Sequence, residues 1–203
     1  MKPLTLAIAL CVMLAGRPVL AQPASEAADH EALRKLKTEV VNAINTRNVQ
    51  SMDTLLHKPF MSTLISQDSF TDINRLKAYF DDLFTRPVLR INKLTMEAEV
   101  DEPAWIYTGT FAVARGSTKE LYELGDGRTY TIPARWTATM IKDNGQWKVL
   151  AAHTGVNFID NPVMTAVEKS TMYFGAGGLA IGAVIGFLVG FFIRRKRRVA
   201  ASA

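Results

Sequence analysis

The chain has 203 residues, a net charge of +5 and a single cysteine. The positive excess comes from its two ends, because all 19 acidic residues lie between residues 22 and 172, where they face only 17 lysines and arginines. This weakly acidic centre argues against a nucleic-acid-binding protein. Cys11 lies in a segment that we expect to be removed, which excludes disulfides, thiolate metal sites and a cysteine nucleophile in the mature chain.

The N-terminus has the pattern of a secretory signal peptide. Lys2 provides a short basic start, and residues 4–14 form an apolar run that is too short to span a bilayer. Val19 and Ala21 are small residues at the positions that precede a cleavage site. We therefore predict a signal peptide over residues 1–21, followed by a short linker over residues 22–28.

The region from residue 29 to residue 162 is long enough for one domain with its own core. Its first third has the apolar spacing of helices. We predict a first helix that begins at Asp29 as its N-cap, and a second, short helix that follows Asn48. A third helix is expected over residues 72–84, and a short strand over residues 60–65.

From Val88 onward the apolar period changes to two, which is typical of strands. The turn segments "DEP", "GDG" and "DNG" separate the strands, and "KELYEL" adds a short hairpin arm. Helices followed by long strands predict an α+β fold, with the helices packed on one face of a curved antiparallel sheet. The predicted strands cover residues 88–100, 104–115, 130–142 and 146–158.

The last hairpin allows a prediction of which side chains face the helices. Asn144-Gly145 is a strong two-residue turn signal. Counting outward from this turn pairs Trp136 with His153. Because side chains alternate along a strand, one face is the more apolar and should point inward, whereas a register shift of one residue would reverse the assignment. The predicted inward face comprises Trp136, Ala138, Met140, Trp147, Val149, Ala151 and His153.

Helices followed by a bent sheet that closes on "RWTATMIKDNG" and "GQWKVLAAH" resemble the nuclear transport factor two-like superfamily, which includes SnoaL-like cyclases and ketosteroid isomerase. The segments "TGTFAV" and "YELGDGR" also fit. The resemblance covers residues 29–162 and implies a cone-shaped domain with an internal pocket and dimerisation through the sheet. It carries over no catalytic residue, because the superfamily includes isomerases, cyclases, dehydratases and non-catalytic proteins.

The candidate site residues follow from the predicted faces. His153 is the first candidate for a general acid or base in the pocket, beside Trp136; the alternative is a core histidine with a hydrogen-bond partner. Asn157 is expected on the same face, or as the cap of a turn. Tyr107 is a pocket or core residue of a central strand. Asp53 lines the mouth of the cone or pairs with His57. The histidines lack metal-ligand spacing, and we expect neither a metal nor a cofactor.

The C-terminus predicts a membrane anchor. Residues 173–193 carry no charge and are long enough to span a bilayer, and the cluster "RRKRR" follows at once. We therefore predict a juxtamembrane linker over residues 163–172, a single transmembrane helix over residues 173–193 and a basic cytoplasmic tail over residues 194–203. The domain would lie outside the cytoplasm, on the periplasmic or cell-exterior side.

Four glycines at intervals of four residues form one stripe of this helix, which is a pattern for close helix packing. They are Gly178, Gly182, Gly186 and Gly190. We expect the anchor to self-associate and the protein to be a homodimer. Two functions remain open: a non-catalytic module that binds a small apolar ligand or an envelope protein, and an isomerase, cyclase or dehydratase that uses His153.

Overall fold

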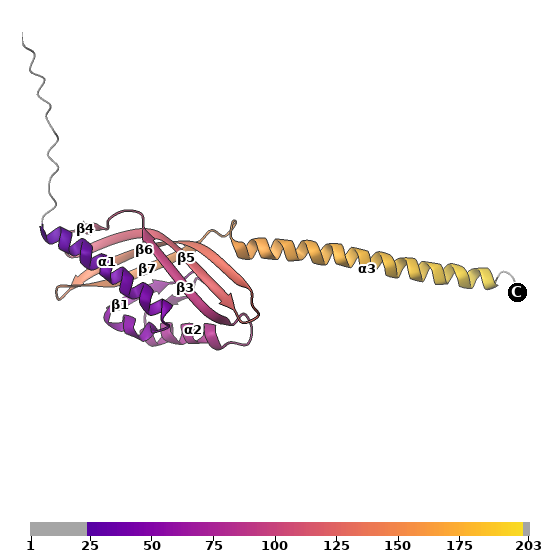
Figure 1. Ribbon diagram of the computed structural model, residues 1–203, viewed down its shortest axis with the longest axis horizontal. Helices are drawn as coiled ribbons and strands as arrows, with labels where there is room; N and C mark the ends of the chain where they lie inside the picture. Colours follow the sequence, from indigo (N-terminus) through magenta and orange to yellow (C-terminus); the bar gives the residue numbers. More distant parts are fainter. Residues whose placement is uncertain (1–23, 201–203) are drawn as a thin grey trace, which may run out of the picture.

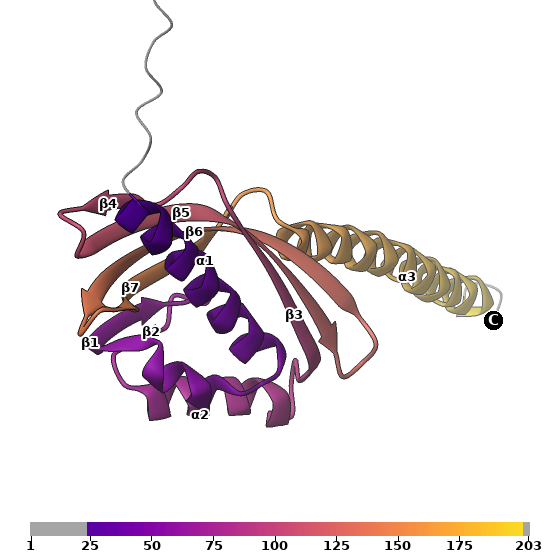
Figure 2. The same ribbon diagram turned by 60° about the vertical axis from the view of Figure 1, so that its left-hand side comes forward.

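A computed structural model describes the backbone of residues 24–200 and the side chains of residues 25–194, so the predicted signal peptide lies outside the described residues. A curved sheet wraps around α1, α2 packs beside them, and α3 extends away from the domain (Figures 1 and 2). The helices are α1 (Ala24–Asn45), the 3-10 helix η1 (Val49–Thr54), α2 (Ile73–Thr85) and α3 (Pro162–Ala200). The strands are β1 (Leu56–Thr63), β2 (Ser69–Phe70), β3 (Ile91–Val100), β4 (Trp105–Tyr107), β5 (Phe111–Leu124), β6 (Thr129–Asp143) and β7 (Gln146–Val156).

The first helix begins earlier than predicted, at Ala24, so most of the predicted linker is helical. Asp29 is therefore not its cap but a buried residue within it. Its carboxylate accepts a hydrogen bond from Trp147 Nε1 at 3.0 Å and lies 2.5 Å from Lys142 Nζ. The hydrogen bond from Lys142 is the main reason why the pKa of Asp29 is lowered. These contacts fasten α1 to the hairpin of β6 and β7.

The other two predicted helices form, one of them in a tighter geometry. The second is η1, in which Val49 and Met52 are buried. The third is α2, and Asp72 caps it by accepting hydrogen bonds from the backbone N–H groups of Asn74 and Arg75, both at 3.0 Å. Its apolar spacing buries the predicted face against the core through Ile73, Leu76, Phe80 and Leu83.

The α+β fold is confirmed, but the sheet is mixed. The strand order is β2-β1-β7-β6-β5-β3, and β1 runs parallel to β7 while the other pairs in this order are antiparallel. The predicted strand over residues 104–115 is instead a hairpin of β4 and the start of β5. Its turn lies at Thr108 and Gly109, which have φ angles of 52° and 69°. The predicted hairpin arm "KELYEL" is the continuous second half of β5.

The hairpin of β6 and β7 follows the predicted register only near its turn. Lys142 pairs with Trp147 and Met140 with Val149, as counted from Asn144-Gly145. The next pair is Thr139 with Ala151, so Leu150 is an extra residue on β7. This β-bulge shifts every later pair by one and turns the following β7 side chains to the opposite face.

The described buried hydrophobic side chains lie between Leu33 and Trp147, and all of them except Ala134 belong to two clusters where the helices meet the sheet. Neither cluster contains a residue of α3. The domain therefore has its complete core without α3, and we expect residues 22–161 to fold independently.

The C-terminal helix is one uninterrupted element. Asn161 caps it by accepting hydrogen bonds from the backbone N–H groups of Val163 and Met164, both at 3.0 Å, and Pro162 occupies the first turn. Its segment Pro162–Arg194 is long and apolar enough to cross a membrane, and an 18-residue stretch within it has a mean hydropathy of 2.3 and no buried residue. Residues 163–172, predicted as a linker, are helical as well.

Candidate functional site

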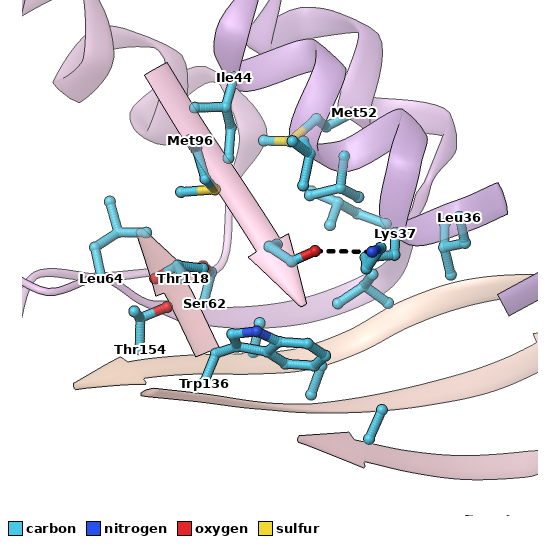
Figure 3. Close-up of a pocket in the computed structure, with 18 of the residues that line it drawn as sticks. Leu36, Lys37, Ile44, Met52, Ser62, Leu64, Met96, Thr118, Trp136 and Thr154 are labelled. Atoms are coloured by element: carbon cyan, nitrogen blue, oxygen red, sulfur yellow. Dashed lines mark hydrogen bonds between the residues drawn. The ribbon is translucent and has the colours of Figure 1, made fainter. Parts of the chain in front are cut away.

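A cavity of about 530 Å³ opens between the helices and the concave face of the sheet. Apolar side chains of α1, α2, β1 and β3 form one part of its wall, and β5, β6 and β7 form the rest. Figure 3 shows Leu36, Ile44, Met52 and Met96 among the apolar lining residues, with the Trp136 ring on the sheet side. A cavity of this size and composition is typical of sites for small molecules.

The exposure of residues along strand β3 indicates which end of the cavity is open. Its alternate residues Leu94, Met96, Ala98 and Val100 all line the cavity. Val100 is 44% exposed, whereas Leu94 is only 5% exposed. The end near Val100 is therefore the mouth, and the end near Leu94 is the floor.

A buried polar cluster lies on β5, in the cavity wall between the mouth and the floor. Thr118, Glu120 and Tyr122 alternate along the strand and pair with Ala98, Met96 and Leu94 of β3. Glu120 is only 3% exposed. Thr118 Oγ1 donates a hydrogen bond to Glu120 Oε1 at 3.3 Å, and the Tyr122 hydroxyl donates to Glu120 Oε2. Among the described residues, no cation forms an ion pair with Glu120.

Burial controls the protonation of this cluster. Desolvation raises the pKa of the Glu120 carboxyl above its ordinary value of 4.5, against the smaller opposing effect of the hydrogen bonds from Tyr122 and Thr118. Burial, together with the neighbouring Glu120, also raises the pKa of the Tyr122 hydroxyl, so Tyr122 remains a hydrogen-bond donor. The cavity thus contains a carboxyl group with an increased affinity for a proton.

Trp136 lines the cavity as the sequence predicts, and Gly116 makes room for it. The two residues are paired across β5 and β6, and Trp136 Nε1 donates a hydrogen bond to the Ser117 carbonyl at 3.1 Å. A Cβ atom on Gly116 would lie 2.7 Å from the Trp136 ring and 1.9 Å from the Glu99 carbonyl oxygen. Glycine is thus the residue that lets the indole lie flat on the sheet.

The predicted inward position of His153 is wrong, because the bulge at Leu150 shifts the register of β7. Trp136 pairs with Thr154 instead of His153, and Ala152 and Thr154 line the cavity. His153 pairs with Thr137 on the outer face and is exposed. Ala151, predicted inward, does not line the cavity either. A role for His153 as an acid or base inside the cone therefore has no support from the geometry.

The other three candidates also lie away from the cavity lining. Asn157 caps the turn after β7, where its Oδ1 accepts hydrogen bonds from the backbone N–H groups of Ile159 and Asp160 at 3.0 and 3.1 Å. Tyr107 is 50% exposed on β4, because the predicted central strand is a hairpin. Asp53 pairs with Lys58 at 3.0 Å, and His57 lies on β1, so their predicted pairing is not formed.

Comparisons with known proteins concern the fold. No protein-family model matches the chain, and no curated protein matches it by sequence. A proposed scytalone dehydratase from Novosphingobium aromaticivorans superimposes with a TM-score of 0.57 at 11% identity, over 66% of this chain and 87% of the other. The hexachlorocyclohexane dehydrochlorinase LinA type 2 superimposes with a TM-score of 0.56 at 12% identity, over 66% of this chain and 88% of the other. The association domain of C. elegans CaMKII superimposes with a TM-score of 0.52 at 15% identity, over 65% of this chain and 98% of the other.

The domain has the nuclear transport factor two-like fold. The resemblance read from the closing strands is confirmed at the level of the fold. In this nuclear transport factor two-like domain the cone encloses the cavity with Glu120 in its wall. Among the described residues, no group of three His, Cys, Asp or Glu side chains is placed to hold a metal ion.

Replacing Glu120 with glutamine is expected to stabilise the nuclear transport factor two-like domain at alkaline pH. The native state holds the Glu120 proton more tightly than the unfolded chain, so stability falls as the pH rises from about 4.5 through the higher native pKa. Glu120→Gln removes this loss. We expect equal melting temperatures at pH 4 and a higher melting temperature for the variant at pH 8, because only the wild type has a carboxyl group whose ionisation is opposed by burial.

The control for this experiment is Glu123→Gln, on the same strand. Glu123 is 42% exposed and pairs with Lys93 at 3.5 Å on the outer face. This variant should follow the wild type at both pH values. A Glu120→Gln protein with the same pH dependence as the wild type would contradict the raised pKa of Glu120.

Proposed function

We propose that the domain binds a small, mostly apolar molecule inside its cone while α3 holds it at the outer face of a membrane. The observation that carries this proposal is the cavity of about 530 Å³, which is lined mainly by apolar side chains and contains one buried carboxyl cluster. Small-molecule sites combine these features: apolar walls provide affinity, and a few polar groups provide orientation. A partner protein would contact the outer surface and would not need this cavity.

The side of the membrane is part of the proposal. The apolar segment of α3 is followed by Arg194–Arg198, and basic clusters beside a span remain on the cytoplasmic side. The pattern of residues 1–21 is that of an exported protein. Both features support an extracytoplasmic domain with its C-terminal tail inside.

We also propose that the protein is a homodimer. Apart from the adjacent backbone of α3 itself, a Cβ atom on Gly178, Gly182, Gly186 or Gly190 would meet no described atom within 4 Å, so the glycine stripe of α3 is open to a second helix. One protein with the same fold is described as an association domain. These two observations support self-association through α3 and through the domain.

Filling the cavity is expected to abolish ligand binding. The probe is N-phenyl-1-naphthylamine, an uncharged fluorophore that brightens in apolar surroundings, added to residues 22–161. Ala138 lies in the cavity wall on β6, so Ala138→Phe places a ring in the ligand volume. We expect the Kd of Ala138→Phe for the fluorophore to be at least tenfold higher than that of the wild type, which is a loss of about 1.4 kcal/mol of binding free energy.

The matched control is Thr137→Phe, one residue away on the outer face. It should bind the fluorophore as the wild type does. Ala152→Leu repeats the test from β7 if Ala138→Phe does not fold. Equal binding by the inward and outward variants, or no binding by the wild type, would refute the proposal.

A second candidate function is proton transfer at Glu120. The observation that favours it is a buried carboxyl group with a raised pKa, without a paired cation among the described residues, in a cavity that a small molecule can enter. A carboxylate that has lost its water shell is a stronger base than one in solution. Two proteins with this fold are named as a dehydratase and a dehydrochlorinase, names that denote eliminations, which begin or end with proton transfer.

A further inference from the structure

The cavity contains a cation near its mouth. Lys37 of α1 is partly buried, and its Nζ donates a hydrogen bond to the Ala98 carbonyl at 2.8 Å (Figure 3). Ala98 lies one inward-facing position below the exposed Val100, so the ammonium group is located just inside the mouth. Its position is fixed by α1 and β3, which are neighbouring parts of the cavity wall.

Other charged groups at the mouth already have partners. Arg34 pairs with Glu31 at 2.7 Å, and Glu102 pairs with Arg115 at 2.9 Å. Lys37 forms no ion pair among the described residues. An ammonium group has three N–H donors, and the Ala98 carbonyl accepts from one of them. Two donors and a full positive charge therefore remain for another partner.

The distance along β3 relates this cation to the carboxyl cluster. Ala98 pairs with Thr118, and Met96, two residues deeper, pairs with Glu120. Two residues of a strand span about 7 Å. Moving inward from the mouth, a ligand would thus meet a cation, then a carboxyl group with a tendency to be protonated, and then the apolar floor at Leu94 and Leu83.

We propose that the ligand of the cone is an anionic, single-chain amphiphile whose carboxylate pairs with Lys37 and whose apolar chain extends to the floor. A carboxylate supplies both the negative charge and the acceptors that Lys37 lacks, and charge-assisted hydrogen bonds are stronger than neutral ones. The cavity volume suits one chain and is too small for a two-chain lipid. This inference rests on the proposed binding function.

The test compares three ligands of equal chain length. Decanoate and decylamine, each below its critical micelle concentration, and decan-1-ol, below its solubility limit, are compared as competitors that displace N-phenyl-1-naphthylamine from residues 22–161. We expect decanoate to bind about tenfold more tightly than decanol, and decylamine to bind most weakly. Lys37→Met keeps the apolar stem of the side chain but removes the charge, so the preference for decanoate over decanol should disappear.

The matched control is Lys35→Met. Lys35 lies on the same helix, is 76% exposed and pairs with Glu39 at 3.7 Å, so this variant has the same change in net charge. It should keep the full preference for decanoate. If Lys37→Met does not fold, Lys37→Gln provides the same comparison.

The outcomes separate this inference from the binding function. If the fluorophore binds but the three ligands compete equally, or the preference survives in Lys37→Met, the inference is wrong and the binding function stands. If the fluorophore does not bind to the wild type, both are wrong.

Discussion

Gly116→Ala is expected to destabilise the domain by about 3 kcal/mol and to lower its melting temperature by about 10 °C. The new methyl group would lie 1.9 Å from the backbone carbonyl oxygen of Glu99. A flexible side chain could move away from such a contact, but this atom is part of β3, so the pairing of β3 with β5 must open. The Trp136 ring, at 2.7 Å, would be displaced into the cavity.

Thermal unfolding followed by circular dichroism measures this effect. The control is Gly155→Ala on β7, where a Cβ atom would meet only His153 Cε1, at an ordinary 3.8 Å. Its melting temperature should change by no more than about 2 °C. Because the displaced indole occupies the ligand volume, Gly116→Ala should also weaken fluorophore binding at temperatures where it remains folded. Equal stability of the two variants would show that Gly116 does not determine how β3, β5 and Trp136 pack.

Glu120→Gln is expected to reduce proton abstraction in the cavity about 100-fold, the usual lower range for one acid–base group. A suitable probe is 5-nitrobenzisoxazole, a small, flat and mostly apolar carbon acid. The Glu120 carboxylate would take the proton from its C3 atom. The C–H electron pair then forms the nitrile, the N–O bond breaks, and the coloured 2-cyano-4-nitrophenolate is released.

The rate should rise with pH as Glu120 loses its proton, and should level off above its raised pKa. Glu123→Gln, which changes the outer face of the same strand, should leave the rate unchanged. If Glu120→Gln and the wild type react at the same rate, Glu120 is not acting as a base, and proton transfer is no longer a candidate function. The binding proposal does not depend on this result.

The sequence predicted the elements whose signals are local. Asp72 and the apolar spacing after it define α2, and Asn144-Gly145 defines the last turn. Up to Val149 the hairpin register follows from that turn. The α+β class follows from the order of the elements, and the nuclear transport factor two-like fold was indicated by the resemblance of the closing strands.

The candidate site was harder to predict, because it depends on two non-local features. The bulge at Leu150 has no marker such as glycine, yet it moves His153 to the outer face. Glu120 is not among the predicted site residues, because "KELYEL" was interpreted as a short hairpin arm and not as part of a long strand of the cone. Its alternation did contain a signal: Glu120 is in phase with Tyr122 and Leu124, which point inward. A carboxyl group in phase with apolar neighbours marks a buried site.

Because α3 is unbroken, a membrane that holds its apolar segment would also determine the orientation of the cone. At about 1.5 Å and 100° per residue, residues 163–172 form a helical spacer of about 15 Å between the domain and the apolar segment, and this spacer sets the distance and the rotation of the domain relative to that segment. One residue inserted there would rotate the cone by about 100° around the helix axis but would change its distance from the apolar segment by only about 1.5 Å. If two copies of α3 pack along the glycine stripe, the direction in which one cavity mouth faces relative to the other would thus depend on the number of residues in this spacer.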